Sequence, residues 1–342
     1  MGKVLDKVKL FAELVKFEHS IFALPYAYVG ALYGASVAWL APSGVWLRVR
    51  ETVLGYLGQH LALAWTFQGD ALPPQVRPVK LPWARDAVTL LPTWSALAWI
   101  TLVMVGARAF AFVLNRAIDK EIDARNPRTA GRAVPAGLVK AWELWLFAAA
   151  MLALYLVGVW QLAPVVRPLA PIPLIAFVVY PYTKRFTNLC HYWLGMCLGL
   201  APVGAWLAVG APANHPAPWL MGAAVALWTA GFDIIYATQD VECDRRDGVH
   251  SMPADVGVAP ALRQTRAVHA ATVVLLVAAG VLAGAGLPWF LGVAVAAGLL
   301  WYENSIVSAE DLSRVDAAFF TTNGIIAIVV LLGAVADVLT GV

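Results

Sequence analysis

Two segments far apart in the chain repeat one acidic pattern. The first contains Asn115, Asp119 and Asp123, and the second contains Asp240 and Asp244, with the same spacing of four residues. On a helix this spacing places side chains on one face, so each segment predicts a stripe of oxygen ligands. Mg²⁺ prefers such ligands and typically binds one or two carboxylates together with substrate phosphates. The pattern therefore predicts Mg²⁺ and a diphosphate held between the two segments.

Basic residues accompany both acidic segments and supply groups that pair with phosphate oxygens. They are Arg116, Lys120, Arg125, Arg128 and Arg132 near the first segment, Arg245 and Arg246 after the second, and Lys184 and Arg185 in a separate loop. Taken singly, any of them could be a solvated loop charge, but the matched acidic stripes favour a joint site. The cysteines and histidines show no ligand spacing, so we expect no zinc site.

Two further charges lie deeper in apolar sequence. Arg108 precedes Asn115 by seven residues and Asp233 precedes Asp240 by seven, so each shares the face of its stripe about two helical turns away. A charge within a membrane span is costly. One interpretation is structural: Arg108 forms an ion pair with Asp233, or Asp233 pairs with Lys184.

Composition defines the elements that must position these residues. Of 342 residues, 61% are hydrophobic and 13% are charged, and the mean hydropathy is +0.72. Soluble domains carry roughly 25% charged residues, and disordered chains have low hydrophobicity, so both classes are excluded. The apolar runs are long and continuous rather than the alternating segments of a barrel. The fold class is therefore all-α, a polytopic membrane protein.

A spanning helix needs about 20 apolar residues, and the charge-free runs predict nine transmembrane helices. These runs are Ser20–Leu47, Ala87–Ala107 with a continuation to Asn115, Leu144–Val166, Pro168–Thr183, Phe186–Phe232 divided at 210–218, Ala267–Tyr302 divided at 284–288, and Ala317–Ala336.

The placement of positive charge predicts the orientation. With the N-terminus inside, the cytoplasmic connections contain 17 of the 24 Lys and Arg residues and the external connections contain six, as the positive-inside rule requires. Both acidic segments then lie at the cytoplasmic ends of even-numbered spans. We expect an integral protein of the cell inner or plasma membrane, with a central cavity open to the cytoplasmic side.

The connection at about 42–92 is unusually long. Its charge-free part, Thr52–Gly69, contains Gln59, His60 and Gln68, and we interpret the connection as an external excursion with an interfacial helix. If it crossed the membrane, the first acidic segment would lie on the side opposite the N-terminus. We expect one domain over residues 1–342 with this connection as an insertion.

Together these motifs resemble the UbiA-type intramembrane prenyltransferases. Asn115-x-x-x-Asp119-x-x-x-Asp123, with Asn126–Gly137 behind it, is similar to the first family signature, and Asp240-x-x-x-Asp244 to the second. Tyr180-Pro-Tyr-Thr-Lys184 resembles a third signature between spans four and five. The resemblance implies that the five acidic and amide residues bind Mg²⁺, that Lys184 and Arg132 bind diphosphate, and that Arg185 assists.

The resemblance also implies roles for the deeper residues. Tyr180, Tyr182 and Tyr236 are candidates for stabilising an allylic cation, although interfacial tyrosines are common. Arg108 is expected to bind the carboxylate of the acceptor. Asp233 is expected to orient or deprotonate the acceptor's hydroxyl group.

The implied activity is Mg²⁺-dependent transfer of a polyprenyl group from polyprenyl diphosphate to an aromatic acid, most like 4-hydroxybenzoate, in ubiquinone or menaquinone biosynthesis. Dihydroxynaphthoate, homogentisate, haem and archaeal lipid precursors are alternative acceptors. A transporter would place its charges near the bilayer midplane. A Mg²⁺-dependent transferase acting on CDP-linked lipids is a further alternative; its Asp-x-x-Asp-Gly spacing occurs at Asp244–Gly248 but not in the first segment. The expected partners are the two substrates and the bilayer, with no nucleic acid.

Overall fold

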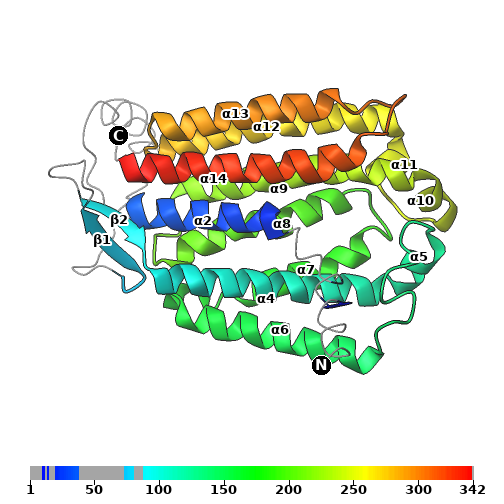
Figure 1. The fold of residues 1–342 in the computed structure, drawn as a ribbon, viewed down its shortest axis with the longest axis horizontal. Coiled ribbons are helices and arrows are strands. Elements are labelled where there is room, and N and C mark those ends of the chain that lie inside the picture. The colour runs from blue at the N-terminus through cyan, green and yellow to red at the C-terminus, as the bar shows by residue number, and fades with distance from the viewer. Residues whose placement is uncertain (1–9, 12–13, 15–19, 38–72, 81–87, 341–342) are drawn as a thin grey trace.

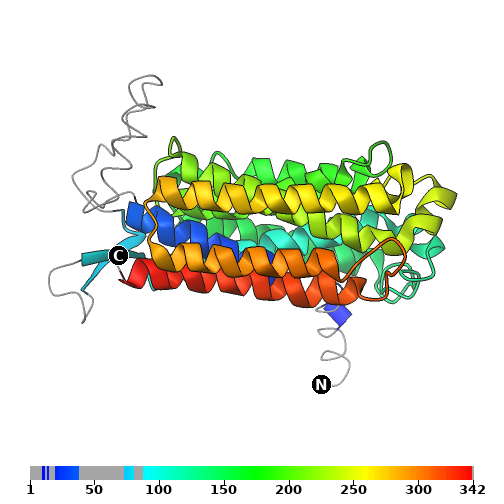
Figure 2. The ribbon, with the colours of Figure 1, turned by 90° about the horizontal axis from the view of Figure 1, so that it is seen from above.

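A computed structural model describes residues 10–11, 14, 20–37, 73–80 and 88–340. Within these residues, nine helices of 13 residues or more lie side by side in one elongated bundle (Figures 1 and 2). They are α2 (Ser20–Val37), α4 (Trp94–Ile118), α6 (Ala141–Gln161), α7 (Pro171–Thr183), α8 (Cys190–Ala208), α9 (Pro216–Ala237), α12 (Val258–Ala283), α13 (Leu287–Ser305) and α14 (Asn323–Thr340).

Six segments in the described part of the chain are long and apolar enough to cross a bilayer. They are Trp94–Ile118, Ala141–Gln161, Pro164–Thr183, Pro216–Asp247, Val258–Ala283 and Ala317–Thr340. Helices α2, α8 and α13 pack beside them. Large apolar side chains remain exposed along the outside of the bundle, including Trp142 and Leu156 on α6, Val274 on α12 and Leu291 on α13. An apolar exterior of this kind suits contact with lipid.

The start of the second predicted helix is wrong. The structure has a strand, β2 (Val88–Pro92), which pairs antiparallel with β1 (Val76–Lys80), so the fold contains one small sheet besides its helices. Pro92 disfavours a helical residue before it, and Thr93 begins α4 by accepting a hydrogen bond from the Ala96 amide. Thr52–Gly69, where we expected an interfacial helix, lies outside the described residues.

The divisions of the two longest apolar runs are confirmed. Helices α8 and α9 are separated by a loop that contains Pro212, and α12 and α13 are separated at Gly284, whose φ of 71° ends α12. Glycines allow α8 to approach α9 closely: a Cβ on Gly195 would lie 2.1 Å from the Ala226 carbonyl oxygen, and one on Gly199 would lie 2.4 Å from that of Gly222.

The two ends of the bundle differ. Three short helices, α5 (Lys120–Arg125), α10 (Val241–Asp247) and α11 (Met252–Val256), gather at one end, and the β1–β2 hairpin lies at the other (Figure 1). Both acidic segments are therefore at the same end of the molecule. Below, this end is called the acidic end.

Candidate active site

A cavity of about 1100 Å³ extends from the acidic end into the bundle. Its mouth is polar, with Asn115, Asp123, Asp240 and Asp244 in the wall beside several basic residues. Deeper in, the lining is apolar and includes Ile100, Val159, Leu198 and Leu207 from three different helices. The cavity can therefore hold a molecule with an anionic head and a long hydrocarbon tail.

The first acidic segment keeps helical periodicity across the junction of α4 and α5. The Asp119 amide donates to the Asn115 carbonyl, and the Asp123 amide donates to the Asp119 carbonyl. The Asp119 carboxylate is 1% exposed and accepts hydrogen bonds from Lys184 Nζ at 2.6 Å and Asn115 Nδ2 at 2.9 Å. Burial raises the pKa of Asp119, although the nearby Lys184 charge opposes this.

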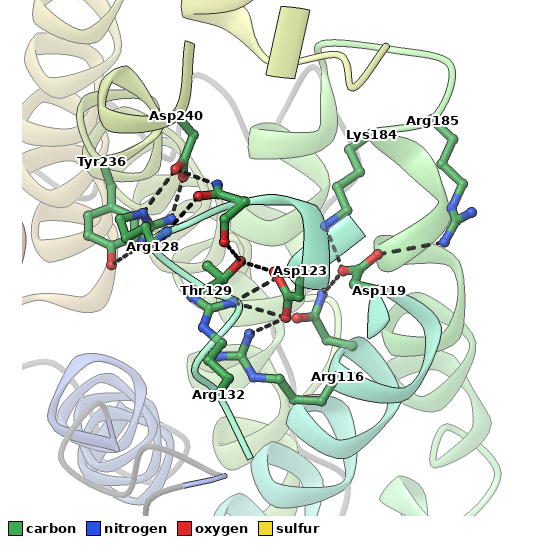
Figure 3. A network of polar contacts seen from close by, with 12 residues as sticks. Arg116, Asp119, Asp123, Arg128, Thr129, Arg132, Lys184, Arg185, Tyr236 and Asp240 are labelled. Atoms are coloured by element: carbon green, nitrogen blue, oxygen red, sulfur yellow. Dashed lines mark hydrogen bonds and ion pairs between the residues drawn. The ribbon is translucent and has the colours of Figure 1, made fainter. Parts of the chain in front are cut away.

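Asp123 is held by two guanidinium groups. Arg116 Nη1 lies 3.2 Å from Asp123 Oδ2, and Arg132 Nη1 lies 2.9 Å from Oδ1 (Figure 3). The loop after α5 is fixed to the same residue, because the Thr129 hydroxyl donates to the Asp123 carbonyl at 2.7 Å. Arg132, a diphosphate-binding candidate from the sequence, thus contacts the carboxylate of Asp123.

The second acidic segment meets the first directly. Asp240 binds Arg128 through Nε at 2.9 Å and also through Nη2, and it accepts from Asn126 Nδ2 at 2.8 Å (Figure 3). Arg128 Nη1 donates to the Tyr236 hydroxyl at 2.8 Å. Burial lowers the pKa of Arg128, but the hydrogen bond and charge of Asp240 outweigh it, so the pKa lies above its ordinary value. Two segments more than 100 residues apart therefore share one polar network.

Asp244 completes the second stripe. Its Oδ2 accepts a hydrogen bond from the Ser251 hydroxyl at 2.7 Å, and Arg246 Nη2 donates to the Arg125 carbonyl at 2.9 Å, which is a further link between the segments. Lys184 and Arg185 approach from the end of α7: Arg185 Nη2 lies 3.7 Å from Asp119 Oδ1. The structure thus brings Lys184 and Arg185 to the first acidic segment, whereas Arg245 Nε donates to the Ala254 carbonyl instead.

The ion-pair partners suggested for Asp233 from the sequence, Arg108 and Lys184, are wrong. Asp233 pairs with His191, whose Nδ1 lies 2.7 Å from Oδ2, and Lys184 pairs with Asp119 instead. Arg108 lines the cavity, and its guanidinium carbon lies 4.7 Å from the centre of the Phe112 ring. Both deep residues therefore face the space where a substrate would lie.

The three tyrosines differ in position. Tyr180 and Tyr236 line the cavity, and Tyr236 stacks on Phe319 with 4.1 Å between ring centres. Tyr182 is 45% exposed and lies beside Arg185, outside the cavity lining. Tyr180 and Tyr236 thus face the cavity, and Tyr182 does not.

Three contributors to the network were given no role from the sequence: Asn126, His191 and Ser251. Arg128 was noted only as one of the basic residues near the first segment. Asn126 and Arg128 directly follow the first stripe, so their proximity in sequence was a usable signal. His191 and Ser251 act on Asp233 and Asp244 across the fold, and no local pattern indicates those contacts.

The oxygen ligands fit Mg²⁺ that is shared with a substrate. Among the described residues, no three His, Cys, Asp or Glu side chains are close enough to hold an ion unaided. Asp119 Oδ1 is buried and accepts no hydrogen bond from any of the described residues. Since Mg²⁺ commonly uses one or two carboxylates plus phosphate oxygens, the donor set suits an ion that arrives with a diphosphate.

An apolar helical bundle with a charged mouth over a long hydrocarbon-lined cavity defines an intramembrane enzyme for amphipathic anionic substrates. The chain belongs to the UbiA prenyltransferase family, whose model matches residues 87–325. It is an integral membrane prenyltransferase.

Similar proteins agree with this assignment. The 4-hydroxybenzoate octaprenyltransferase of Paraburkholderia phytofirmans is 30% identical over 68% of this chain and 80% of its own length. That of Cupriavidus necator is 31% identical over 68% of this chain and 81% of its length.

Solved structures show the same fold. The apo structure of a UbiA homolog from Aeropyrum pernix has a TM-score of 0.71 and 29% identity, and the match covers 94% of this chain and 98% of that one. A UbiA homolog from Archaeoglobus fulgidus bound to GPP and Mg²⁺ has a TM-score of 0.61 and 20% identity, with 96% and 99% covered.

Proposed function

We propose that this protein transfers a polyprenyl group from polyprenyl diphosphate to 4-hydroxybenzoate or a closely related hydroxybenzoic acid, with Mg²⁺ as cofactor. The main support is the contact of Asp240 with Asn126 and Arg128, which joins both acidic segments at the mouth of an apolar cavity. The names of the similar curated proteins favour the hydroxybenzoate acceptor. The Archaeoglobus homolog bound to GPP and Mg²⁺ supports the donor and the metal.

The reaction breaks the bond between the allylic carbon and the diphosphate oxygen and forms a carbon–carbon bond to the aromatic ring. Diphosphate leaves with the bonding electrons, and the ring loses one proton. Mg²⁺ would be held by Asn115, Asp119, Asp123, Asp240 and Asp244, and it supplies Lewis-acid stabilisation of the leaving diphosphate.

The basic residues of the mouth bind the diphosphate in this proposal. Lys184, Arg132 and Arg185 donate to its oxygens, and Arg116 and Arg128 are close enough to contribute. All of them now contact carboxylates or backbone carbonyls at the mouth. Because guanidinium groups bind phosphate in a bidentate manner, exchange of carboxylate for phosphate retains their hydrogen bonds.

The acceptor binds deeper in the cavity. Arg108 pairs with its carboxylate, Asp233 orients or deprotonates its hydroxyl group, and the rings of Tyr180 and Tyr236 stabilise the allylic carbon as positive charge develops. The prenyl tail extends along the apolar lining. In the membrane, all nine long helices cross the bilayer and the cavity mouth opens to the cytoplasm.

Mass spectrometry of products tests the proposal. Purified enzyme with Mg²⁺ is offered prenyl diphosphates together with 4-hydroxybenzoate, dihydroxynaphthoate, homogentisate or haem. Prenylated hydroxybenzoate is the expected main product, and chelation of divalent ions abolishes its formation. Prenylation of another acceptor alone would refute the acceptor assignment.

Two variants test the metal ligands. Asp119→Ala and Asp240→Ala are expected to abolish turnover, since each removes a carboxylate ligand, and circular dichroism should show both to be folded. The control is Glu310→Ala, an exposed acid in the loop after α13. Wild-type turnover in Asp240→Ala would contradict the metal model.

A further inference from the structure

His191 connects three elements of the active site. It lies on α8, and its side chain is 4% exposed. Its Nδ1 lies 2.7 Å from Oδ2 of Asp233 on α9, and its Nε2 accepts the backbone N–H of Met252 at 3.1 Å. Met252 is the first residue of α11, so one imidazole joins α8, α9 and the loop after the second acidic segment.

These contacts determine where the imidazole proton lies. Because Nε2 accepts a hydrogen bond from an amide, it carries no proton. The single proton of the neutral ring is then on Nδ1, where it is donated to Asp233. A histidine in this state is a fixed hydrogen-bond donor and does not exchange protons with a substrate.

The other oxygen of Asp233 is available for chemistry. Asp233 lines the cavity and its side chain is 20% exposed. In the described part of the chain, this carboxylate is hydrogen-bonded to His191. Oδ2 is thus held by His191, while no described residue donates a hydrogen bond to Oδ1 that would compete with a substrate.

The same histidine contacts the loop that orients Asp244. Ser251 directly precedes Met252 and donates its hydroxyl hydrogen to Asp244 Oδ2 at 2.7 Å. The amide that binds His191 Nε2 and the hydroxyl that binds Asp244 therefore belong to adjacent residues. The position of Asp233 is in this way linked to the position of the second acidic stripe.

We propose that His191 is a positioning residue that holds Asp233 as an ionised, correctly oriented acceptor for the hydroxyl proton of the aromatic substrate. This rests on the proposed function. As the ring attacks the allylic carbon, the hydroxyl proton passes to Asp233 Oδ1, a carbon–carbon bond forms, and the allylic carbon–oxygen bond breaks. Loss of the ring proton to solvent then restores aromaticity, and Asp233 returns its proton to the product oxygen.

Two substitutions separate this role from simple packing. In His191→Asn the side-chain amide can replace Nδ1 and still donate to Asp233, but it cannot reach the Met252 amide. In His191→Gln the terminal oxygen can replace Nε2 and accept from Met252, while the donor to Asp233 is lost. The matched variants thus remove one contact each.

The expected result is a difference in kcat. His191→Gln should lower kcat for the aromatic acceptor by about 10- to 100-fold, the scale of one hydrogen bond to a charged group. The KM for prenyl diphosphate should stay at the wild-type value. His191→Asn should recover most of the lost kcat. Melting temperatures of the purified variants report on stability separately.

A double-mutant cycle provides the second readout. Asp233→Asn alone should lower kcat by about 10²- to 10⁴-fold, the usual range for a general base. In that background, His191→Gln should cause no further loss, because its effect acts through the Asp233 carboxylate. A full additional loss, equal losses in both His191 variants, or wild-type kcat in His191→Gln would each overturn the proposal.

The wild-type enzyme distinguishes this failure from failure of the proposed function. If wild-type protein prenylates hydroxybenzoate and His191→Gln does so equally well, only the positioning role is refuted. If wild-type protein prenylates no hydroxy-substituted aromatic ring, the proposed function fails, and the role of His191 fails with it.

Discussion

Three aspartates at the cavity mouth each form an ion pair with at least one basic residue. Asp119 binds Lys184, Asp123 binds Arg116 and Arg132, and Asp240 binds Arg128. Partly buried charges need such partners, since removing a partner leaves an uncompensated charge. Under the proposed function, a Mg²⁺–diphosphate complex can replace these pairs without loss of compensation, because phosphate takes the cations and the metal takes the carboxylates.

Arg108 offers a test of acceptor recognition at the scale of one residue. Arg108→Ala should lower kcat/KM for 4-hydroxybenzoate by about 10- to 100-fold, since a hydrogen bond to a charged group contributes ~1.5–3 kcal/mol. The KM for prenyl diphosphate should change little, because Arg108 lies about two helical turns from Asn115. Steady-state kinetics with each substrate varied in turn measures both.

The methyl ester of the acceptor is the matched control for this prediction. It lacks the carboxylate, so wild-type enzyme and Arg108→Ala should use it with similar efficiency. An equal loss for the acid and the ester, or an equal effect on prenyl diphosphate, would remove the acceptor role from Arg108.

At the scale of one element, α8 serves two purposes along its length. Near its start, Gly195 and Gly199 allow contact with the backbone of α9. Near its end, Gly204 lines the cavity, and a Cβ there would meet no atom within 4 Å. One helix therefore provides both a packed seam and an open wall.

Gly195→Ala should destabilise the bundle. A methyl group at this position would lie 2.1 Å from the Ala226 carbonyl oxygen, so the two helices must separate. Overpacking of this kind typically costs about 1–3 kcal/mol. Gly204→Ala, on the same helix but facing open space, should show a much smaller change. Thermal unfolding in detergent compares them, and equal melting temperatures would contradict the packing argument.

Gly204→Phe should shorten the prenyl chain that the enzyme accepts. The aromatic ring would project into the apolar part of the cavity, where the proposed function places the tail. Turnover of geranyl diphosphate should be retained while that of octaprenyl diphosphate falls. Gly298→Phe is the matched control, since Gly298 also has no atom within 4 Å of a Cβ and does not line the cavity. An unchanged ratio of the two donors in Gly204→Phe would place the tail elsewhere.

At the scale of the whole molecule, the two ends of the bundle differ in structure. The acidic end contains α5, α10, α11 and the cavity mouth, and the opposite end contains the β1–β2 hairpin (Figure 1). Exposed apolar side chains cover the outside between the ends. The charge distribution of the sequence predicts that the acidic end faces the cytoplasm.

Thiol labelling tests this orientation. In a variant whose three native cysteines are replaced, Glu242→Cys at the acidic end should react with a membrane-impermeant maleimide in inverted vesicles and not in intact cells. Ala213→Cys, in the α8–α9 loop at the opposite end, should show the reverse. Labelling of Glu242→Cys in intact cells would invert the topology.

The sequence by itself determined the helical membrane class, the position of most helices and the acidic and basic character of the mouth. Hydrophobic runs and charge-free stretches are local properties, and so is the spacing of Asp119 and Asp123, so each can be read without coordinates. The start predicted at Ala87 is misplaced because Pro92 and the strand partner β1 override an apolar run. The start predicted at Ala267 is also misplaced, since α12 begins at Val258 and includes the charged residues Arg263 and Arg266. Whether 42–92 acts as a separate insertion in one domain stays a prediction.

Only the tertiary structure decided which residues meet. The pairing of Arg128 with Asp240 and of His191 with Asp233 depends on how distant helices pack, and helical spacing contains no information about partners on other helices. The same is true of Gly195 and Gly204: both are glycines on α8, and the neighbouring helix determines that one is a contact and the other an opening. Periodicity defines the face of a helix, whereas packing defines what that face touches.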